Sequence, residues 1–146
     1  MLDTRELYQQ IILDHNRSPR NFHIIETPSS HAEGNNPLCG DVMSIDLMLS
    51  NNVIEAVAFQ GAGCAISKAS ASVMTEFIKG KTRRETLDLI DRFAELITGE
   101  TEMPDPGPLA AFAGVRDYPS RVRCATLAWQ TLKAAIEGTK ETITTE

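Results

Sequence analysis

Apolar residues recur every three to four positions in four stretches of the chain, a spacing that predicts amphipathic helices. A proline or glycine follows the end of each stretch, where the chain leaves a helix most easily. The third stretch also opens on Thr82 and Glu85, which match the pattern of an N-terminal capping box. The predicted helices cover residues 4–17, 65–79, 82–98 and 120–137.

Between the first two predicted helices, the pattern changes to alternation of apolar and polar residues. Residues 42–49 and 53–60 are separated by Ser50, Asn51 and Asn52, which form a turn signal, so we predict a β-hairpin. The residues predicted to face the core are Met43, Ile45, Leu47 and Leu49 on the first strand and Val53, Val57 and Phe59 on the second.

The remaining segments are polar or rich in proline. Residues 21–37 are predicted to be a loop with room for one short strand, and residues 100–108 hold three prolines and are predicted to be a loop or insertion. The polar tail after Gly138 is predicted to fray. No repeat or linker divides the chain. We therefore predict one domain over residues 1–146, with an α+β fold in which helices pack on one face of a small antiparallel sheet.

The charge of the chain excludes one broad class of partner. Lys and Arg number 14 against 20 Asp and Glu, which gives a net charge of -6, and the basic residues are scattered rather than clustered. A nucleic-acid partner is not expected, because phosphate contacts need a basic face. No run of apolar residues approaches the length of a membrane span, and the N-terminus lacks the pattern of a signal peptide. We expect a cytoplasmic protein with no membrane partner.

The chain contains three cysteines, an odd number that cannot pair completely within one molecule. In a reducing cytosol such thiols are more often ligands or nucleophiles than disulfides. Cys39 precedes the first predicted strand, Cys64 lies between the hairpin and its helix, and Cys124 lies near the start of the last helix. Asp41 follows Cys39 at two residues and can present a carboxylate to the same point.

Position at a helix N-terminus favours the thiolate form of a cysteine, and we expect this effect for Cys64 and Cys124. Three thiolates and the Asp41 carboxylate would complete a tetrahedral zinc site, or hold iron while a cluster forms. Each residue also has a simpler interpretation: a lone cysteine is often a small buried apolar residue, and a lone aspartate often caps a turn. A Cys–His hydrolase is a further alternative, with histidines available at positions 15, 23 and 31.

Four segments of the chain resemble one known family. Residues 7–22 are similar to its opening helix and loop, and residues 36–41, 61–67 and 121–127 are similar to its three cysteine motifs, in the same order. This is the U-type iron–sulfur cluster assembly scaffold family, which includes IscU, SufU and the N-terminal domain of NifU. Arg123 stands where IscU-like members carry a histidine, and residues 117–121 lack their chaperone-binding motif. The stretch around residues 100–118 resembles an insertion typical of SufU, so the chain resembles the SufU branch.

The resemblance to that branch implies zinc held by Cys39, Asp41, Cys64 and Cys124, with Arg121 beside the metal. It further implies sulfur transfer from a SufS-like pyridoxal-phosphate cysteine desulfurase, with downstream iron–sulfur assembly or acceptor proteins as further partners. We predict Cys39 as the first sulfur acceptor, because its glycine-flanked loop can move without unwinding a helix. Two alternatives stay open: a scaffold that builds and transfers a [2Fe–2S] cluster, and a zinc-binding interaction module. Whether the chain is itself an enzyme also stays open.

Overall fold

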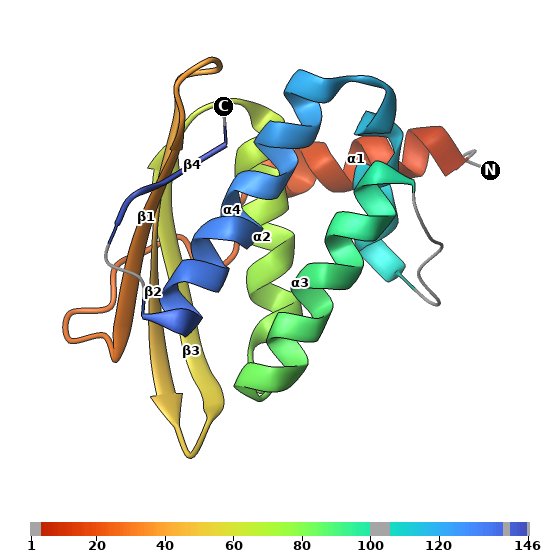
Figure 1. The fold of residues 1–146 in the computed structure, drawn as a ribbon. Coiled ribbons are helices and arrows are strands. Elements are labelled where there is room, and N and C mark those ends of the chain that lie inside the picture. Colours follow the sequence, from red (N-terminus) through yellow and green to blue (C-terminus); the bar gives the residue numbers. More distant parts are fainter. Residues whose placement is uncertain (1–3, 100–105, 139–140, 146) are drawn as a thin grey trace.

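The computed structural model describes residues 4–99, 106–138 and 141–145, in which one β-sheet forms one layer and the helices form the other (Figure 1). All four helices predicted from periodicity are present at the predicted places, within one residue at each end. The elements are α1 (Thr4–Arg17), β1 (Ser30–Asn36), β2 (Asp41–Ser50), β3 (Val53–Ala62), α2 (Ala65–Ile78), α3 (Arg83–Thr98), the 3-10 helix η1 (Gly107–Asp117), α4 (Pro119–Glu137) and β4 (Ile143–Thr144).

The four described strands lie in the order β3-β2-β1-β4. Strand β2 pairs antiparallel with both β1 and β3, whereas β4 pairs parallel with β1, with Gly34 opposite Ile143. The prediction of a purely antiparallel sheet is therefore wrong, and the sheet is mixed. The reason is that α4 runs along the sheet opposite to β1 and returns the chain to the end where β1 begins, so β4 runs in the same direction as β1 (Figure 1).

The β2–β3 hairpin matches the prediction except at one point. Ile45, Leu47 and Phe59 are at most 2 % exposed, as the alternation predicted. On β3, however, Ile54 is fully buried where the alternation placed Val53. The pairing of the two strands shifts between Met48 and Leu49, and a one-residue shift exchanges the two faces of a strand.

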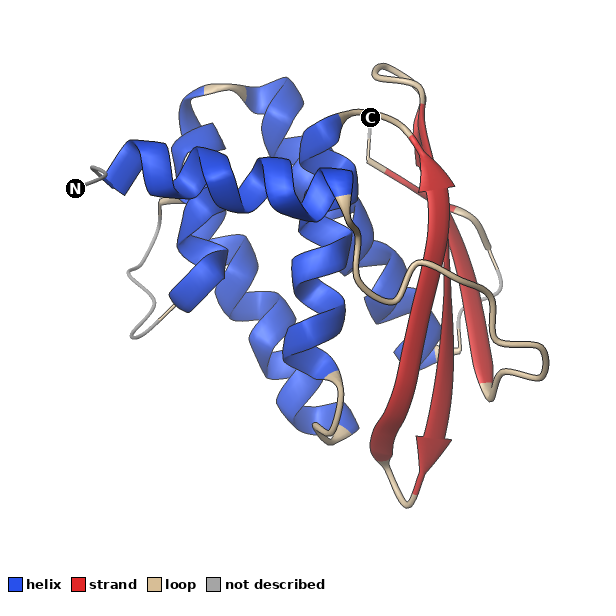
Figure 2. Cartoon of the chain, turned by 180° about the vertical axis from the view of Figure 1, so that it is seen from behind, coloured by secondary structure: helices blue, strands red, loops and turns tan. Residues whose placement is uncertain are grey.

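Helices cover one face of the sheet, and α1 runs across the front of the helical layer in Figure 2. The capping box predicted at Thr82 is present, and Gly99 ends α3 in the left-handed conformation. Trp129 of α4 stacks on Phe93 of α3 with ring centroids 4.3 Å apart, and its indole N–H donates to Ser70 Oγ of α2 at 3.0 Å. These contacts tie α2, α3 and α4 into one core. In the ranges given above, no helix has the length and apolar character needed to cross a membrane.

Three regular segments lie outside the predicted helices and the predicted hairpin. Residues 30–36 form β1, within the segment predicted to have room for one short strand. Its bounds could not be predicted, because the inward residues Ala32, Gly34 and Asn36 are small or polar and show no apolar alternation. Residues 107–117 form η1, while residues 100–105 of the predicted loop lie outside the described residues. The predicted frayed tail includes β4, and Thr145 N–H donates to Asn35 O at 3.1 Å. The C-terminal residues thus extend the sheet beside β1.

Candidate metal centre

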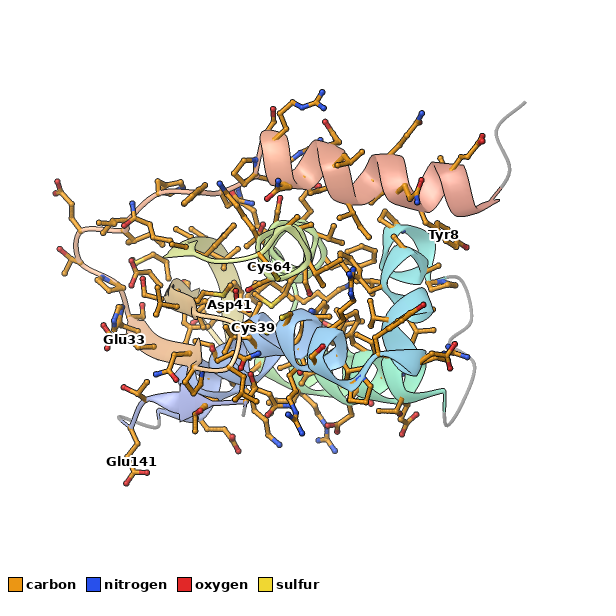
Figure 3. The ribbon with its side chains drawn as sticks, turned by 90° about the horizontal axis from the view of Figure 1, so that it is seen from above. Tyr8, Glu33, Cys39, Asp41, Cys64 and Glu141 are labelled. Atoms are coloured by element: carbon orange, nitrogen blue, oxygen red, sulfur yellow. The ribbon has the colours of Figure 1, made fainter. Side chains whose placement is uncertain are left out.

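The three cysteines and Asp41 gather at the end of the sheet that is uppermost in Figure 1. Cys39 lies in the turn between β1 and β2, Asp41 is the first residue of β2, and Cys64 is the N-cap of α2. Figure 3 shows Cys39, Asp41 and Cys64 grouped together, whereas the labelled Glu33 and Glu141 lie at the periphery. Cys124 approaches the group from α4.

The spacing of the donor atoms suits a single metal ion. One donor atom from each of Cys39, Asp41 and Cys124 lies within 4.8 Å of the other two. Cys64 lies outside this group of three, but its Sγ is 3.8 Å from Asp41 Oδ2, so it borders the group. Tetrahedral sulfur ligands at about 2.3 Å from zinc are roughly 3.8 Å apart, so the three grouped donors need only a small contraction to hold one ion. Three sulfurs and one carboxylate fit zinc, and they equally fit iron of a small cluster.

Asp41 is held in place by the backbone that carries Cys64. Its side chain is fully buried, and its Oδ1 accepts the Cys64 N–H at 2.8 Å. Gly63 has a φ of +154°, and a Cβ at this position would clash with the Asp41 carboxylate. The glycine before Cys64 therefore serves a close approach to Asp41.

Cys64 occupies the position predicted for it, at the N-terminus of a helix. Its sulfur accepts the Ser67 N–H of the first turn of α2 at 3.4 Å, which is the geometry of an N-cap. Free N–H groups and the helix dipole both favour negative charge at this point. The predicted place of Cys64 at the start of a helix is therefore confirmed.

Cys124 does not match its prediction. Helix α4 begins at Pro119, so Cys124 lies in the second turn, and its side chain is 3 % exposed. Burial, followed by hydrogen bonds with Cys39, Asp41 and Cys64, raises the pKa of Cys124 well above the usual range for a thiol. The expectation that the helix start favours its thiolate is therefore wrong for the metal-free chain, because Cys124 lies beyond the first turn and is buried. A cation among these donors would reverse this preference.

Cys39 is the exposed thiol of the set, and it lies at the tip of the β1–β2 hairpin. Its N–H donates to Asn36 O at 3.2 Å, and Gly40 follows with a φ of +72°. Leu38 and Val42, on either side, are both more than half exposed. The turn therefore holds Cys39 at the surface, between two exposed apolar side chains.

The basic residues of the last cysteine motif lie at the surface. Arg121 is exposed, and its guanidinium stacks over the Tyr118 ring at 5.7 Å from the centroid. Arg123 is also exposed. The contact described for Arg121 is thus with an aromatic ring at the start of α4, while its predicted place beside a metal stays a prediction.

The histidines have partners away from the cysteines. His15 is buried and hydrogen-bonded to Ser72 at 2.7 Å, and His31 is bonded to Asp46 at 2.5 Å. His23 is exposed, and its Nδ1 lies 3.3 Å from the carbonyl oxygen of the adjacent Ile24. No contact described for a histidine involves a cysteine, which removes the structural basis for the Cys–His hydrolase alternative.

One residue without a predicted role contacts the site. Asn36 is fully buried, and its Nδ2 donates to Cys124 Sγ at 3.8 Å. The sequence signal for such a residue is its place directly before the turn of Cys39. Asparagine is common in turns, so its place in the sequence is explained without any contact with Cys124.

Comparison with known proteins gives consistent matches over most of the chain. The family described as NifU-like N terminal domain matches residues 7–145. The zinc-dependent sulfurtransferase SufU of Bacillus subtilis is 39% identical over 137 residues, covering 92% of this chain and 91% of that protein. The iron-sulfur cluster assembly scaffold protein IscU of Streptococcus pyogenes is 38% identical over 133 residues, covering 90% and 83%.

Comparison with solved structures also gives a match over most of the chain. The crystal structure of an iron-sulfur cluster assembly scaffold protein for the SUF system, from Fervidobacterium islandicum, superposes with a TM-score of 0.83. It is 34% identical in sequence, and the match covers 92% of this chain and 99% of that one. The mixed sheet with helices on one face is therefore the fold of that structure also.

Proposed function

The chain belongs to the NifU-like N-terminal domain family, and from this premise we propose that it is an iron–sulfur cluster assembly protein that accepts sulfur at a zinc-binding site. The observation that carries the proposal is the convergence of Cys39, Asp41 and Cys124, whose donor atoms lie within 4.8 Å of one another. Cys64, 3.8 Å from Asp41, supplies the fourth donor. The similarity to the B. subtilis zinc-dependent sulfurtransferase supports zinc as the metal.

Zinc, when bound, keeps the thiols deprotonated at neutral pH and so available as protected nucleophiles. The three cysteines differ in how firmly the fold holds them, and this difference suggests which of them reacts. Cys64 is fixed by the first turn of α2, and Cys124 is buried on α4. Cys39 is exposed on a hairpin turn, where local opening costs least. Cys39 is therefore the thiol that leaves the group and reacts.

The proposed partner is a SufS-like pyridoxal-phosphate cysteine desulfurase that carries a persulfide on its own cysteine. The Cys39 thiolate attacks the outer sulfur of that persulfide. A new S–S bond forms on Cys39, the S–S bond of the partner breaks, and the partner's cysteine departs as a thiolate. No external oxidant or reductant is needed, because the sulfur is transferred at its existing oxidation level. Downstream assembly or acceptor proteins would then take the sulfur.

Arg121 has a proposed role in this step. It lies one turn before Cys124 on α4 and is exposed, and its described contact is with the ring of Tyr118. An exposed guanidinium can leave such a stacking contact at small cost and form a charge-assisted hydrogen bond with a displaced carboxylate or thiolate. Replacement of Arg121 by alanine should slow sulfur transfer without emptying the metal site.

The experiment begins with metal analysis of protein purified without added metal and continues with a desulfurase assay. We expect about one zinc per chain and strong loss of zinc in Cys39→Ser and Cys124→Ser, since a hydroxyl is a poor zinc ligand. Asp117→Ala, which alters an exposed carboxylate outside the group, is the control and should keep its zinc. Full zinc retention in both cysteine variants would refute the shared site. After brief reaction with desulfurase and cysteine, mass spectrometry should locate the persulfide on Cys39.

The second candidate is a scaffold on which a [2Fe–2S] cluster is assembled and passed on. The similarity to the S. pyogenes scaffold protein, at nearly the same identity, favours this alternative. A cluster reconstituted on the purified chain, stable to gel filtration and transferable to an apo-ferredoxin, would support it. Desulfurase stimulation that requires zinc and fails with the cluster-loaded chain would support the first candidate instead. The third alternative, a structural zinc module, predicts zinc binding without either activity.

A further inference from the structure

Asn36 ends β1 and connects the turn of Cys39 with the helix of Cys124. Its backbone oxygen accepts the Cys39 N–H at 3.2 Å, and its side-chain Oδ1 accepts the Leu38 N–H at 3.2 Å. On the other side of the amide, Nδ2 donates to Cys124 Sγ at 3.8 Å. Both Asn36 and Cys124 are buried, so the contact between the Asn36 amino group and the sulfur does not compete with bulk water.

The orientation of this amide follows from its partners. The Leu38 N–H is a donor and needs an oxygen opposite it, which places Oδ1 on the turn side. The amino group must then point at Cys124. The flipped amide would set two donors against each other at Leu38 and two acceptors against each other at a Cys124 thiolate, and both contacts would be repulsive.

A role in the turn alone does not account for an asparagine here. The turn uses only the side-chain oxygen, and aspartate or serine provides an equivalent acceptor at such positions. The amino group is the part that distinguishes asparagine, and its partner is a candidate metal ligand distant in the sequence. A buried amino group directed at a sulfur gains most when that sulfur is a thiolate, because hydrogen bonds to charged acceptors are stronger.

We propose that Asn36 is a positioning residue of the metal centre, whose amino group donates a hydrogen bond to the Cys124 sulfur and so keeps Cys124 in place while Cys39 exchanges. This inference depends on the proposed function. A hydrogen bond withdraws electron density from the sulfur and lowers its nucleophilicity. Asn36 thus directs an incoming persulfide sulfur to Cys39 and away from Cys124. The same residue anchors the Cys39 turn through Oδ1, so one amide serves both cysteines.

Two variants separate the effect of the amino group on Cys124 from the role of the side-chain oxygen in the turn. Asn36→Asp keeps the size of the side chain and an oxygen for the Leu38 N–H, and Asn36→Ser keeps a small acceptor without adding charge. Both lose the donor to Cys124. The matched controls are Asn35→Asp and Asn35→Ser, one residue away on β1 and, by the alternation of a strand, on its opposite face. An effect shared by both Asn36 variants and absent from both controls belongs to the lost donor.

The first readouts are metal affinity and the spectrum of the Co²⁺-loaded chain. We expect zinc affinity, measured by chelator competition, to fall about tenfold in both Asn36 variants, as for loss of one hydrogen bond to a charged group. The thiolate-to-Co²⁺ charge-transfer band should move to lower energy, because the sulfur regains electron density. After reaction with desulfurase, the share of persulfide on Cys124 relative to Cys39 should rise severalfold. Unchanged spectra and an unchanged ratio would overturn the inference.

A measurement on the unmutated chain tests the same hydrogen bond without requiring that the Asn36 variants fold. When the chain is loaded with ¹¹³Cd, the Asn36 amino protons should show a scalar coupling to the metal through the N–H···S bond. Absence of this coupling in a chain that binds cadmium would overturn the role of Asn36 and leave the metal site intact. Failure of the unmutated chain to bind Zn²⁺, Co²⁺ or Cd²⁺ would instead refute the proposed function, so the two failures are distinguishable.

Discussion

Gly63→Ala tests whether the position of Asp41 depends on a missing side chain. A Cβ at Gly63 would clash with the Asp41 carboxylate and also meet the Asp41 Cα at 3.0 Å. The backbone contact means that rotation of the Asp41 side chain cannot relieve the clash. A φ of +154° adds strain, since this region is nearly exclusive to glycine. The variant must therefore displace β2, the backbone before α2, or both.

The magnitude follows from two separate costs. Strain at such a backbone position costs about 1–3 kcal/mol, and an inserted methyl group in a packed site costs a further 1–3 kcal/mol or so. Gly40→Ala is the matched control, because Gly40 also has a positive φ but has nothing within 4 Å of a built Cβ. It should lose only about 1–2 kcal/mol. Gly63→Ala should therefore exceed the control by roughly 2 kcal/mol.

The assay is urea unfolding of the metal-free chains, followed by fluorescence of Trp129, the single tryptophan. With a slope of about 2 kcal/mol per M, the two variants should differ by roughly 1 M in midpoint. Gly63→Ala should also bind zinc more weakly than Gly40→Ala, because Asp41 no longer keeps its place. Equal midpoints and equal zinc affinities in the two variants would refute the reasoning.

Two further predictions concern stability away from the metal site. Gly34→Ala should lower the free energy of unfolding by about 1–3 kcal/mol, because the new methyl group would clash with α4, whereas Gly114→Ala, with open space around it, should be neutral; urea midpoints compare the two. The pKa of His15 is lowered chiefly by burial, so its contribution to stability is present above its ordinary value of 6.5 and is lost as the pH falls. The pKa of His31 is raised chiefly by its hydrogen bond with Asp46, so its contribution is present below 6.5 and is lost as the pH rises. Urea midpoints from pH 5 to 8 should therefore show His31→Gln most destabilised at low pH and His15→Gln least affected there; parallel curves for the two variants would contradict this.

The predictable part of the fold is the part with strong periodicity. The helical spacing of apolar residues in α1 and their alternation in β2 predicted the ends of both elements to within a residue or two. Strand β1 was predicted only as one short strand somewhere within residues 21–37, because its inward positions, Ala32, Gly34 and Asn36, carry little apolar signal. Strand β4 was missed because two residues contain no period, and its pairing depends on the neighbouring β1.

For the site, the sequence could indicate which residue types act but not their surroundings. The motifs predicted that the cysteines and Asp41 share a site, and the structure brings them to one end of the sheet. Depth of burial depends on the whole fold, so the raised pKa of Cys124 could not be inferred from its place on a helix. The contact of Asn36 with Cys124 likewise spans most of the chain, and no local pattern encodes it.

The location of Cys124 on α4 has a consequence for biosynthesis. The chain leaves the ribosome from its N-terminus, so Cys39, Asp41 and Cys64 emerge well before Cys124. A nascent chain thus offers two thiols and a carboxylate, an incomplete set that holds metal weakly. Helix α4 also brings Trp129 to close the core against α3. Helix α4, which is synthesised late, thus completes both the core and the set of metal donors. Metal is therefore expected to bind tightly only after the chain has folded, and the fraction of chains with bound metal then measures the fraction that is folded.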